Sequence, residues 1–179
     1  MTRIPYPNVD PASGEKQAML SAGPVLNVVR MSMHVNDTLW AAQSKLGHAT
    51  VFGTDMDERL REVLILRVAY LSDSDYELFH HLSIARRLGL GEEKIDALRT
   101  GDFTPLTPQE RAVAEFTSEV LLDISPSDQT LASVRALFSD ALVMEMVLLI
   151  GSYMTTARVI AVSGIECDAS AVEAWSEES

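Results

Sequence analysis

The stretch YELFHHLSIARRLGL, residues 76–90, has the apolar periodicity of an amphipathic helix. At 100° per residue, Glu77 and His81 lie one turn apart on the same stripe. This stripe continues through the apolar residues Ile84 and Leu88. Buried ionisable groups are costly unless they are paired or hydrogen-bonded, so the spacing predicts that the two polar side chains face inward and interact. Spacing alone leaves both a structural and a catalytic role open.

Helical patterns cover most of the remaining chain, and strand signals are weak, because no alternating β-branched run is bounded by hairpin turns. The clearest helix start is Thr107, where Pro108 takes the first helical position and Glu110 completes a capping box. We predict an all-α, single-domain helical bundle. Its expected parts are an extended arm over 1–12, a helical domain over 13–167 and an acidic tail over 168–179.

Another helix start lies before the apolar run RLREVLILRVAYL. Here both Thr54–Asp57 and Asp55–Glu58 have the spacing of a capping box. Glycines mark several helix ends, as at Gly89 and Gly164. The expected helices cover residues 13–21, 24–34, 36–53, 54–71, 76–89, 91–101, 107–122, 125–138 and 140–164.

The composition describes an acidic domain of ordinary size. The chain has 179 residues, 47% of them hydrophobic, and a formal net charge of -12. This acidity argues against nucleic acid or an anionic membrane as a partner. The single cysteine, Cys167, excludes an intrachain disulfide. Residues 141–164 are apolar enough to span a membrane, but Glu145 and Arg158 interrupt them, so we expect a buried helix of a cytoplasmic protein.

The helix before residues 76–90 adds two charged residues to the expected interior. Arg67 stands alone in an otherwise apolar run, and Glu62 shares its stripe with apolar residues. A buried arginine must find an anion or a route to solvent. We therefore expect Glu62 and Arg67 to join Glu77 and His81 in a polar pocket with hydrophobic walls.

Residues 60–95, LREVLILRVAYLSDSDYELFHHLSIARRLGLGEEKI, resemble the signature of the carboxymuconolactone decarboxylase and alkylhydroperoxidase D superfamily. The shared features are an Arg-Glu pair at the start of an apolar helix, then Glu-x-x-x-His, then Ala-x-x-x-Gly-Leu before an acidic helix start. The opening IPYPNVD and the tyrosine-containing last helix extend the resemblance more loosely. It implies the all-α fold of the superfamily and a homo-oligomer such as a trimer, a hexamer or a dimer. The apolar helix over 141–164, with Gly151 for close helix approach, favours the same expectation.

One branch of the superfamily reduces peroxides with a CxxC pair, a histidine and a glutamate from the previous helix. On this chain the cysteine positions fall at Ser74 and Glu77, while the histidine falls at His81 and the earlier glutamate at Glu62. Dithiol chemistry needs a thiolate and a resolving cysteine, and neither stands at these positions. The resemblance therefore points to the cysteine-free branch, which includes a decarboxylase of aromatic catabolism that uses no cofactor.

This branch implies a lyase that transfers protons on a small lactone or enolisable carboxylic acid. Loss of carbon dioxide leaves an enolate that must be protonated, which requires a proton donor and stabilisation of negative charge. His81 suits the proton transfer, and Glu77 or Glu62 orients it or shares its proton. Arg67 is expected to hold a substrate carboxylate or to have an internal partner instead. Tyr76 is expected at the pocket rim.

Other interpretations remain open. Glu77-x-x-His80 has the spacing of half of a di-iron site, but the sequence has no second copy, so we expect no metal. His80 itself is expected at a surface or an interface. The chain is alternatively a non-catalytic helical oligomer that binds a small ligand, or a peroxidase-related protein that has lost its thiols. An open pocket that touches both Glu77 and His81 would favour catalysis.

Overall fold

The protein is all-α, as the sequence predicts, in a computed structural model that describes residues 2–10, 12, 14–23 and 25–169. These residues form nine helices and no strand. The helices are α1 (Gly14–Ala22), α2 (Asn27–Ser32), α3 (Asp37–Phe52), α4 (Glu58–Leu71), α5 (Asp75–Arg87), α6 (Glu92–Thr100), α7 (Pro108–Asp123), α8 (Asp128–Arg135) and α9 (Asp140–Ser163).

Helix α4 forms the centre of the fold because its sequence is apolar on almost every side. It packs against α5, α6, α7 and α9, and every residue from Glu62 to Ala69 is buried. Phe116 of α7 and Met146 of α9 belong to the same core. A fully buried side chain of this kind contributes about 1.5–3 kcal/mol relative to exposure, so α4 anchors the helices around it.

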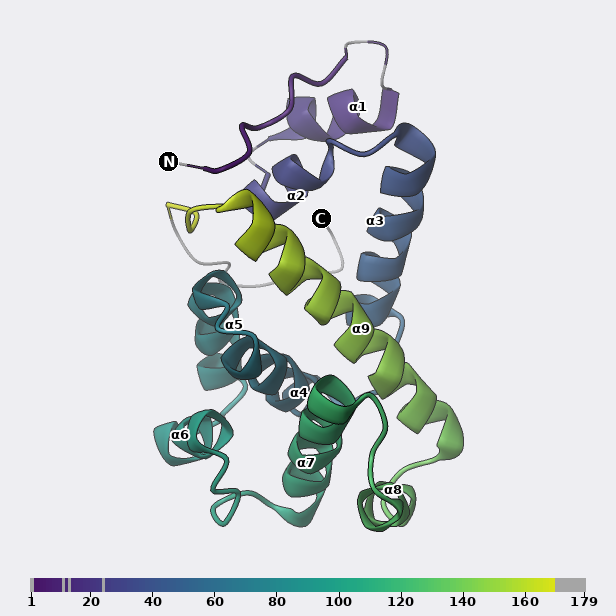
Figure 1. Cartoon of the computed structure of the whole chain (residues 1–179), viewed down its shortest axis with the longest axis vertical. Coiled ribbons are helices and arrows are strands. Elements are labelled where there is room, and N and C mark those ends of the chain that lie inside the picture. Colours follow the sequence, from purple (N-terminus) through teal and green to yellow (C-terminus); the bar gives the residue numbers. More distant parts are fainter. Residues whose placement is uncertain (1, 11, 13, 24, 170–179) are drawn as a thin grey trace.

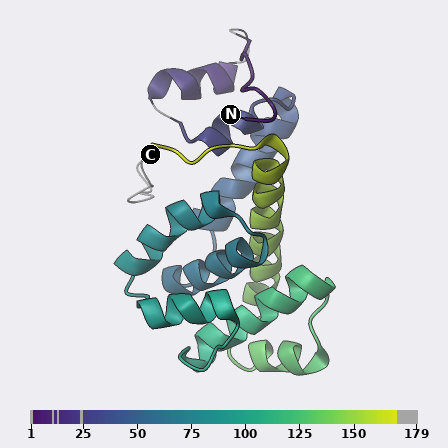
Figure 2. The same ribbon diagram turned by 60° about the vertical axis from the view of Figure 1, so that its left-hand side comes forward.

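The long helix α9 crosses the molecule and connects its two ends (Figure 1). It begins beside α8 and ends near α2, and α4 and α5 lie alongside it in the turned view (Figure 2). Its inner face, which includes Met146 and Ile150, is buried. The candidate site described below lies where α4, α5 and α9 meet.

Local sequence signals predicted one helix start and missed another. The capping box of α7 is confirmed, because the Thr107 hydroxyl accepts the N–H of Glu110 and the Glu110 carboxylate accepts the N–H of Thr107. Both starts proposed for α4 were wrong, since its N-cap is Asp57 and its side chain accepts two N–H groups of the first turn. The Thr54 hydroxyl instead donates to Glu145 of α9 at 2.5 Å, a contact 91 residues away in sequence.

Helix α9 is buried on one face only, although the sequence predicted a buried helix. On its outer face Met144, Leu148 and Val162 are 56–62% exposed. We call the outer face that includes these three residues the α9 stripe. By length and composition α9 could cross a membrane, but core helices of soluble proteins meet the same criteria, so one such helix is weak evidence. Its packing on α2, α3, α4 and α7 gives it a core role in this fold.

The predicted N-terminal arm packs against the end of α9. The N–H groups of Arg3 and Ile4 donate to the Ser163 carbonyl at 2.7 and 3.1 Å. Gly164 follows with a φ of 65°, and a Cβ at this position would lie 2.9 Å from the Arg3 side chain. A glycine is therefore required by both the backbone and the close approach of the arm. Of the predicted tail over 168–179, residues 170–179 lie outside the described residues.

Candidate functional site

Glu62 of α4 and His81 of α5 form a buried pair across two helices. The imidazole Nδ1 lies 2.8 Å from Glu62 Oε2, and the two side chains are 8% and 3% exposed respectively. With Nδ1–H donating to the carboxylate, the remaining ring nitrogen, Nε2, is the one that can take up a proton. No described residue forms a hydrogen bond with Nε2. A carboxylate that orients an imidazole with one free nitrogen is an arrangement suited to acid–base catalysis.

Glu77 is the second acid of the site, and it is buried without a hydrogen bond from any described residue to either carboxylate oxygen. Burial raises the pKa of Glu77 from 4.5 to about 7, and the nearby Ser74 hydroxyl and His81 offset this rise only in part. Ser74 lies close enough to influence the carboxylate, but the geometry falls short of a normal hydrogen bond. A carboxyl group with a pKa near 7 can take up or release a proton at neutral pH.

The structure corrects the pairing expected within α5. Glu77 and His81 do share the inward stripe, yet the imidazole bonds to Glu62 of the neighbouring helix and not to Glu77. Side chains one turn apart on a helix project in nearly parallel directions. Both therefore point toward the neighbouring helices, and α4 presents a carboxylate in line with Nδ1. The result is one paired acid and one unpaired acid beside a single histidine.

Tyr153 of α9 completes the group, and the sequence analysis did not select it. Its ring meets the His81 ring edge to face, with centroids 5.2 Å apart and planes at 76°. Part of the side chain remains accessible, but burial of the phenol raises its pKa well above 10, and the charges of Glu62 and Glu77 raise it further. The phenol therefore stays protonated at neutral pH. A tyrosine in the middle of an otherwise apolar helix was the signal that could have identified it.

Tyr76 belongs to a different cluster, on the side of α5 that faces α2 and the chain after α9. Its hydroxyl donates to Asp168 and accepts the N–H of Val28, and burial raises its pKa. The same Asp168 carboxylate lies 3.0 Å from His80 Nε2 and accepts the N–H of Asn27 at 2.9 Å. Tyr76 is thus not brought to the Glu62–His81 pair. The surface position expected for His80 was wrong, because this residue is 3% exposed.

Arg67 also lies away from the site. Its Nη1 donates to the Leu98 carbonyl at 2.6 Å and its Nε to the Ser118 hydroxyl at 2.8 Å, while its guanidinium lies 5.1 Å from the centroid of the Phe103 ring. Burial lowers its pKa. Five residues after Glu62 on the same helix, Arg67 faces α6 and α7. Of the two roles that the sequence left open, this geometry supports the internal partner.

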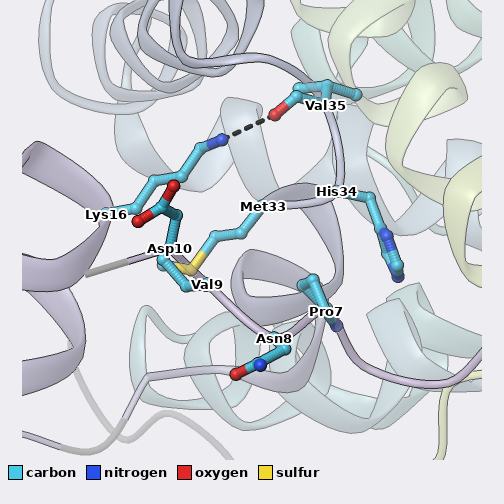
Figure 3. A pocket seen from close by; sticks show the side chains of 8 residues that line it. All are labelled: Pro7, Asn8, Val9, Asp10, Lys16, Met33, His34 and Val35. Atoms are coloured by element: carbon cyan, nitrogen blue, oxygen red, sulfur yellow. Dashed lines mark hydrogen bonds between the residues drawn. The ribbon is translucent and has the colours of Figure 1, made fainter. Parts of the chain in front are cut away.

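Two surface cavities lie at the end of the molecule that contains the N-terminal arm. The first, about 250 Å³, is formed by the arm, by α1 and by residues 33–35, and Figure 3 shows Lys16 reaching across it to the Val35 carbonyl at 2.6 Å. The second, about 420 Å³, is lined by the arm, α1 and residues around Arg30. Neither includes Glu62, Glu77 or His81. Within the described part of the chain, no group of three or more His, Cys, Asp or Glu side chains could hold a metal ion.

We predict no thiol-dependent peroxidase activity. The resemblance places Ser74 and Glu77 at the positions of the thiols. Cys167 is exposed beyond α9. Cys167→Ser should leave any native activity unchanged. The measurements are peroxide consumption with a dithiol reductant and turnover of any compound that the protein is found to convert. A large loss of activity in a variant with an unaltered circular dichroism spectrum would show that the thiol takes part.

Comparison with known proteins supports the same fold and family. The sequence model of the carboxymuconolactone decarboxylase family matches residues 38–119. An uncharacterized peroxidase-related protein from Silicibacter sp. TM1040 superposes with a TM-score of 0.79 at 19% identity, covering 94% of this chain and 92% of that one. An alkylhydroperoxidase AhpD core from Ralstonia eutropha JMP134, also an uncharacterized peroxidase-related protein, gives 0.75 at 16% identity, covering 94% and 93%.

A protein of unknown function from Agrobacterium tumefaciens has a TM-score of 0.67 at 20% identity, covering 74% of this chain and 92% of that one. No curated protein matches the sequence. At these identities the structural likeness establishes the fold, and the sequence match establishes the relationship. The matched span contains α4 and α5 with Glu62, Glu77 and His81. Over residues 38–119, which contain these three side chains, the chain therefore matches the carboxymuconolactone decarboxylase family.

Proposed function

We propose that the protein is a cofactor-free lyase that transfers a proton on a small lactone or enolisable carboxylic acid, as in aromatic catabolism. The observation that carries this proposal is Glu77, a buried carboxyl group with no hydrogen bond from a described residue and a pKa near 7. Such a group is expensive to bury, and perturbed acids of this kind gather at functional sites. It stands one turn from an imidazole that Glu62 already orients.

The arrangement supplies two groups for proton transfer. His81 exchanges a proton at Nε2, and Glu62 holds the ring and stabilises the imidazolium that forms. Glu77 exchanges a second proton at its unpaired carboxyl group. When a substrate loses carbon dioxide, the electron pair of the broken bond moves into an enolate, and one of these groups delivers the proton that restores the carbonyl. The side chain that delivers this proton regains one from water, so each turnover consumes one solvent proton.

The test is a search for proton transfer in heavy water. Purified protein is incubated in D₂O with a panel of carboxylated lactones, β-keto acids and unsaturated dicarboxylic acids, and NMR records carbon dioxide loss and deuterium incorporation. We expect at least one compound to exchange or decarboxylate at a rate proportional to protein concentration. The same rate in wild type and in Glu77→Gln, or no reaction with any compound, would contradict the proposal.

One observation favours a second function, the binding of a small ligand without catalysis. Glu62 and Glu77 are only 2–3% exposed, and neither cavity reaches them. A peroxidase-related origin, as in the names of the two neighbours, is compatible with the same fold. Native mass spectrometry of the purified protein would identify a retained molecule. A ligand that binds tightly and is chemically unaltered when it is released would support this second function.

We also propose that the protein is a cytoplasmic homo-oligomer that associates through the α9 stripe. Exposed apolar side chains such as those of Met144 and Leu148, one turn apart, are costly in water, and a second copy of the chain would cover them. Leu148→Glu should therefore shift the protein toward its 19.6 kDa monomer in sedimentation velocity at micromolar concentration. Ile124→Glu, a matched change at an 88% exposed apolar residue outside the stripe, should not. A wild-type protein that sediments only as a monomer would contradict the proposal.

A further inference from the structure

Tyr153 presents a hydrogen-bond donor at the site that no described residue uses. Its ring is fixed against His81, and no hydrogen bond joins its hydroxyl to the described residues. Tyrosine hydroxyls in protein interiors usually find a partner. The pKa of Tyr153 is raised first by burial and then by the charges of Glu62 and Glu77. The unused donor therefore belongs to a ring that packs on His81, the hydrogen-bond partner of Glu62.

Arg61 is a cation within electrostatic range of Tyr153. Its Nη1 donates to the Val51 carbonyl at 2.7 Å, which fixes the guanidinium between α4 and the end of α3. Its Nε is buried without a hydrogen-bond acceptor among the described residues. The Arg61 charge lowers the pKa of Tyr153. This effect is smaller than the rise caused by burial, Glu62 and Glu77.

We propose that Tyr153 donates a hydrogen bond to the substrate oxygen on which negative charge develops, and that Arg61 binds a carboxylate of the same substrate. This inference rests on the proton-transfer function proposed above and specifies its substrate class as a small carboxylic acid. Tyr153 and Arg61 are then substrate-contacting residues. Arg67, the cation that the sequence suggested for this role, is occupied by Leu98 and Ser118.

The charges of the site explain why both residues are needed. Glu62 and Glu77 make the site acidic, so an anionic substrate requires a fixed cation, and a forked guanidinium suits a carboxylate. As carbon dioxide leaves, the electron pair moves onto the neighbouring carbonyl and forms an enolate oxygen. A neutral phenol in a site with little water stabilises this oxygen more than the ground-state carbonyl. Glu77 or His81 then delivers a proton to carbon, which neutralises the enolate and ends the reaction.

Kinetics separate the two roles. Tyr153→Phe keeps the ring on His81 and should lower kcat and kcat/KM together by roughly 10²–10³-fold, as expected when one oxyanion donor is lost. For a substrate that keeps a second carboxylate after carbon dioxide leaves, Arg61→Gln should instead raise KM. It should have no effect on KM when that second carboxylate is a methyl ester. Tyr70→Phe removes a phenol from the far part of α4 and is the matched control for the first change. Arg67→Gln is the control for the second, and it should lower stability while leaving KM unchanged.

A binding experiment tests the inference without turnover. Oxalate serves as a small planar oxyanion, and oxamide is its neutral counterpart. In protein labelled with ¹³Cζ-tyrosine, oxalate should shift the Tyr153 resonance, and oxamide should not. Arg61→Gln should weaken oxalate binding at least about tenfold, which corresponds to about 1.4 kcal/mol.

The outcomes distinguish this inference from the proposed function. If wild type catalyses exchange but oxalate leaves the Tyr153 resonance in place and Tyr153→Phe is fully active, the inference is wrong and the proton-transfer function stands. If oxalate binds at Tyr153 and Arg61 but no compound exchanges, the anion site is supported and the lyase proposal fails. A Tyr153→Phe variant with a lower melting temperature and unchanged kcat would mean that the phenol is only structural.

Discussion

His81→Asn should lower turnover roughly 10²–10⁴-fold while the protein remains folded. The asparagine amide can still donate to Glu62 Oε2, the only described hydrogen-bond partner of the His81 ring, so the buried carboxylate keeps a hydrogen bond. It has no titratable nitrogen in the position of Nε2, so proton transfer is lost. The measurement is the rate of deuterium incorporation into a substrate from the panel, per folded molecule, with the melting temperature recorded on the same sample.

His81→Ala should abolish turnover as well, but at a further cost in stability. It leaves Glu62 buried without its described partner, which destabilises a protein by about 1–3 kcal/mol. The fold should survive because α5 keeps Leu78, Leu82 and Ile84 in its packing. His48→Asn, at an exposed histidine of α3, is the matched control and should change neither quantity. Wild-type turnover in folded His81→Asn would show that the histidine is structural.

Glu77→Gln should make the protein more stable above pH 7 while strongly reducing its turnover. In the unfolded chain Glu77 titrates near 4.5, and burial raises its pKa to about 7 in the folded protein. Between these two values the folded state binds more protons than the unfolded state, so stability falls as pH rises. Glu77 alone lowers the free energy of unfolding by about 3 kcal/mol, and this decrease is complete above pH 7. Below pH 4.5 Glu77 is neutral in both the folded and the unfolded state, so it does not lower stability in this way.

Urea unfolding at pH 5 and at pH 8 measures this difference. The gain from Glu77→Gln should be small at pH 5 and approach the full amount at pH 8, because glutamine keeps the shape and removes the charge. Glu92→Gln, at an exposed acid whose pKa Arg86 lowers, is the control and should show no such gain. Equal stability differences at the two pH values would mean that Glu77 is not a buried acid with a raised pKa. A more stable but inactive variant is typical of a functional residue.

Local sequence signals were sufficient for most helices and for the inward direction of the acids. Thr107, Pro108 and Glu110 predicted the start of α7 because a capping box involves only neighbours in the chain. The helical period placed Glu62, Glu77 and His81 on inward stripes, and all three are buried. The sequence also shows directly that positions 74 and 77 hold serine and glutamate. According to the resemblance, this separates the chain from the dithiol branch of the superfamily.

The partners of these side chains were decided only when the helices packed. His81 had a candidate acid one turn away, but the bond goes to Glu62, 19 residues earlier, because the angle between α4 and α5 determines which carboxylate meets Nδ1. The start of α4 shifted for a similar reason, since Thr54 bonds to Glu145 of α9. Periodicity gives the direction in which a side chain leaves its helix. It carries no information about which residue of another helix that side chain contacts.

The sequence by itself therefore determined the all-α class, the resemblance to the family and the set of buried acid–base groups on α4 and α5. Only the tertiary structure assigned Arg67 to Leu98 and Ser118, Tyr76 to Asp168, and Tyr153 to the side of His81. Helix formation depends on neighbours within a few residues, which a sequence displays directly. A site at the meeting of three helices depends on contacts up to 72 residues apart, as between the rings of His81 and Tyr153, and these exist only after the core has closed around α4.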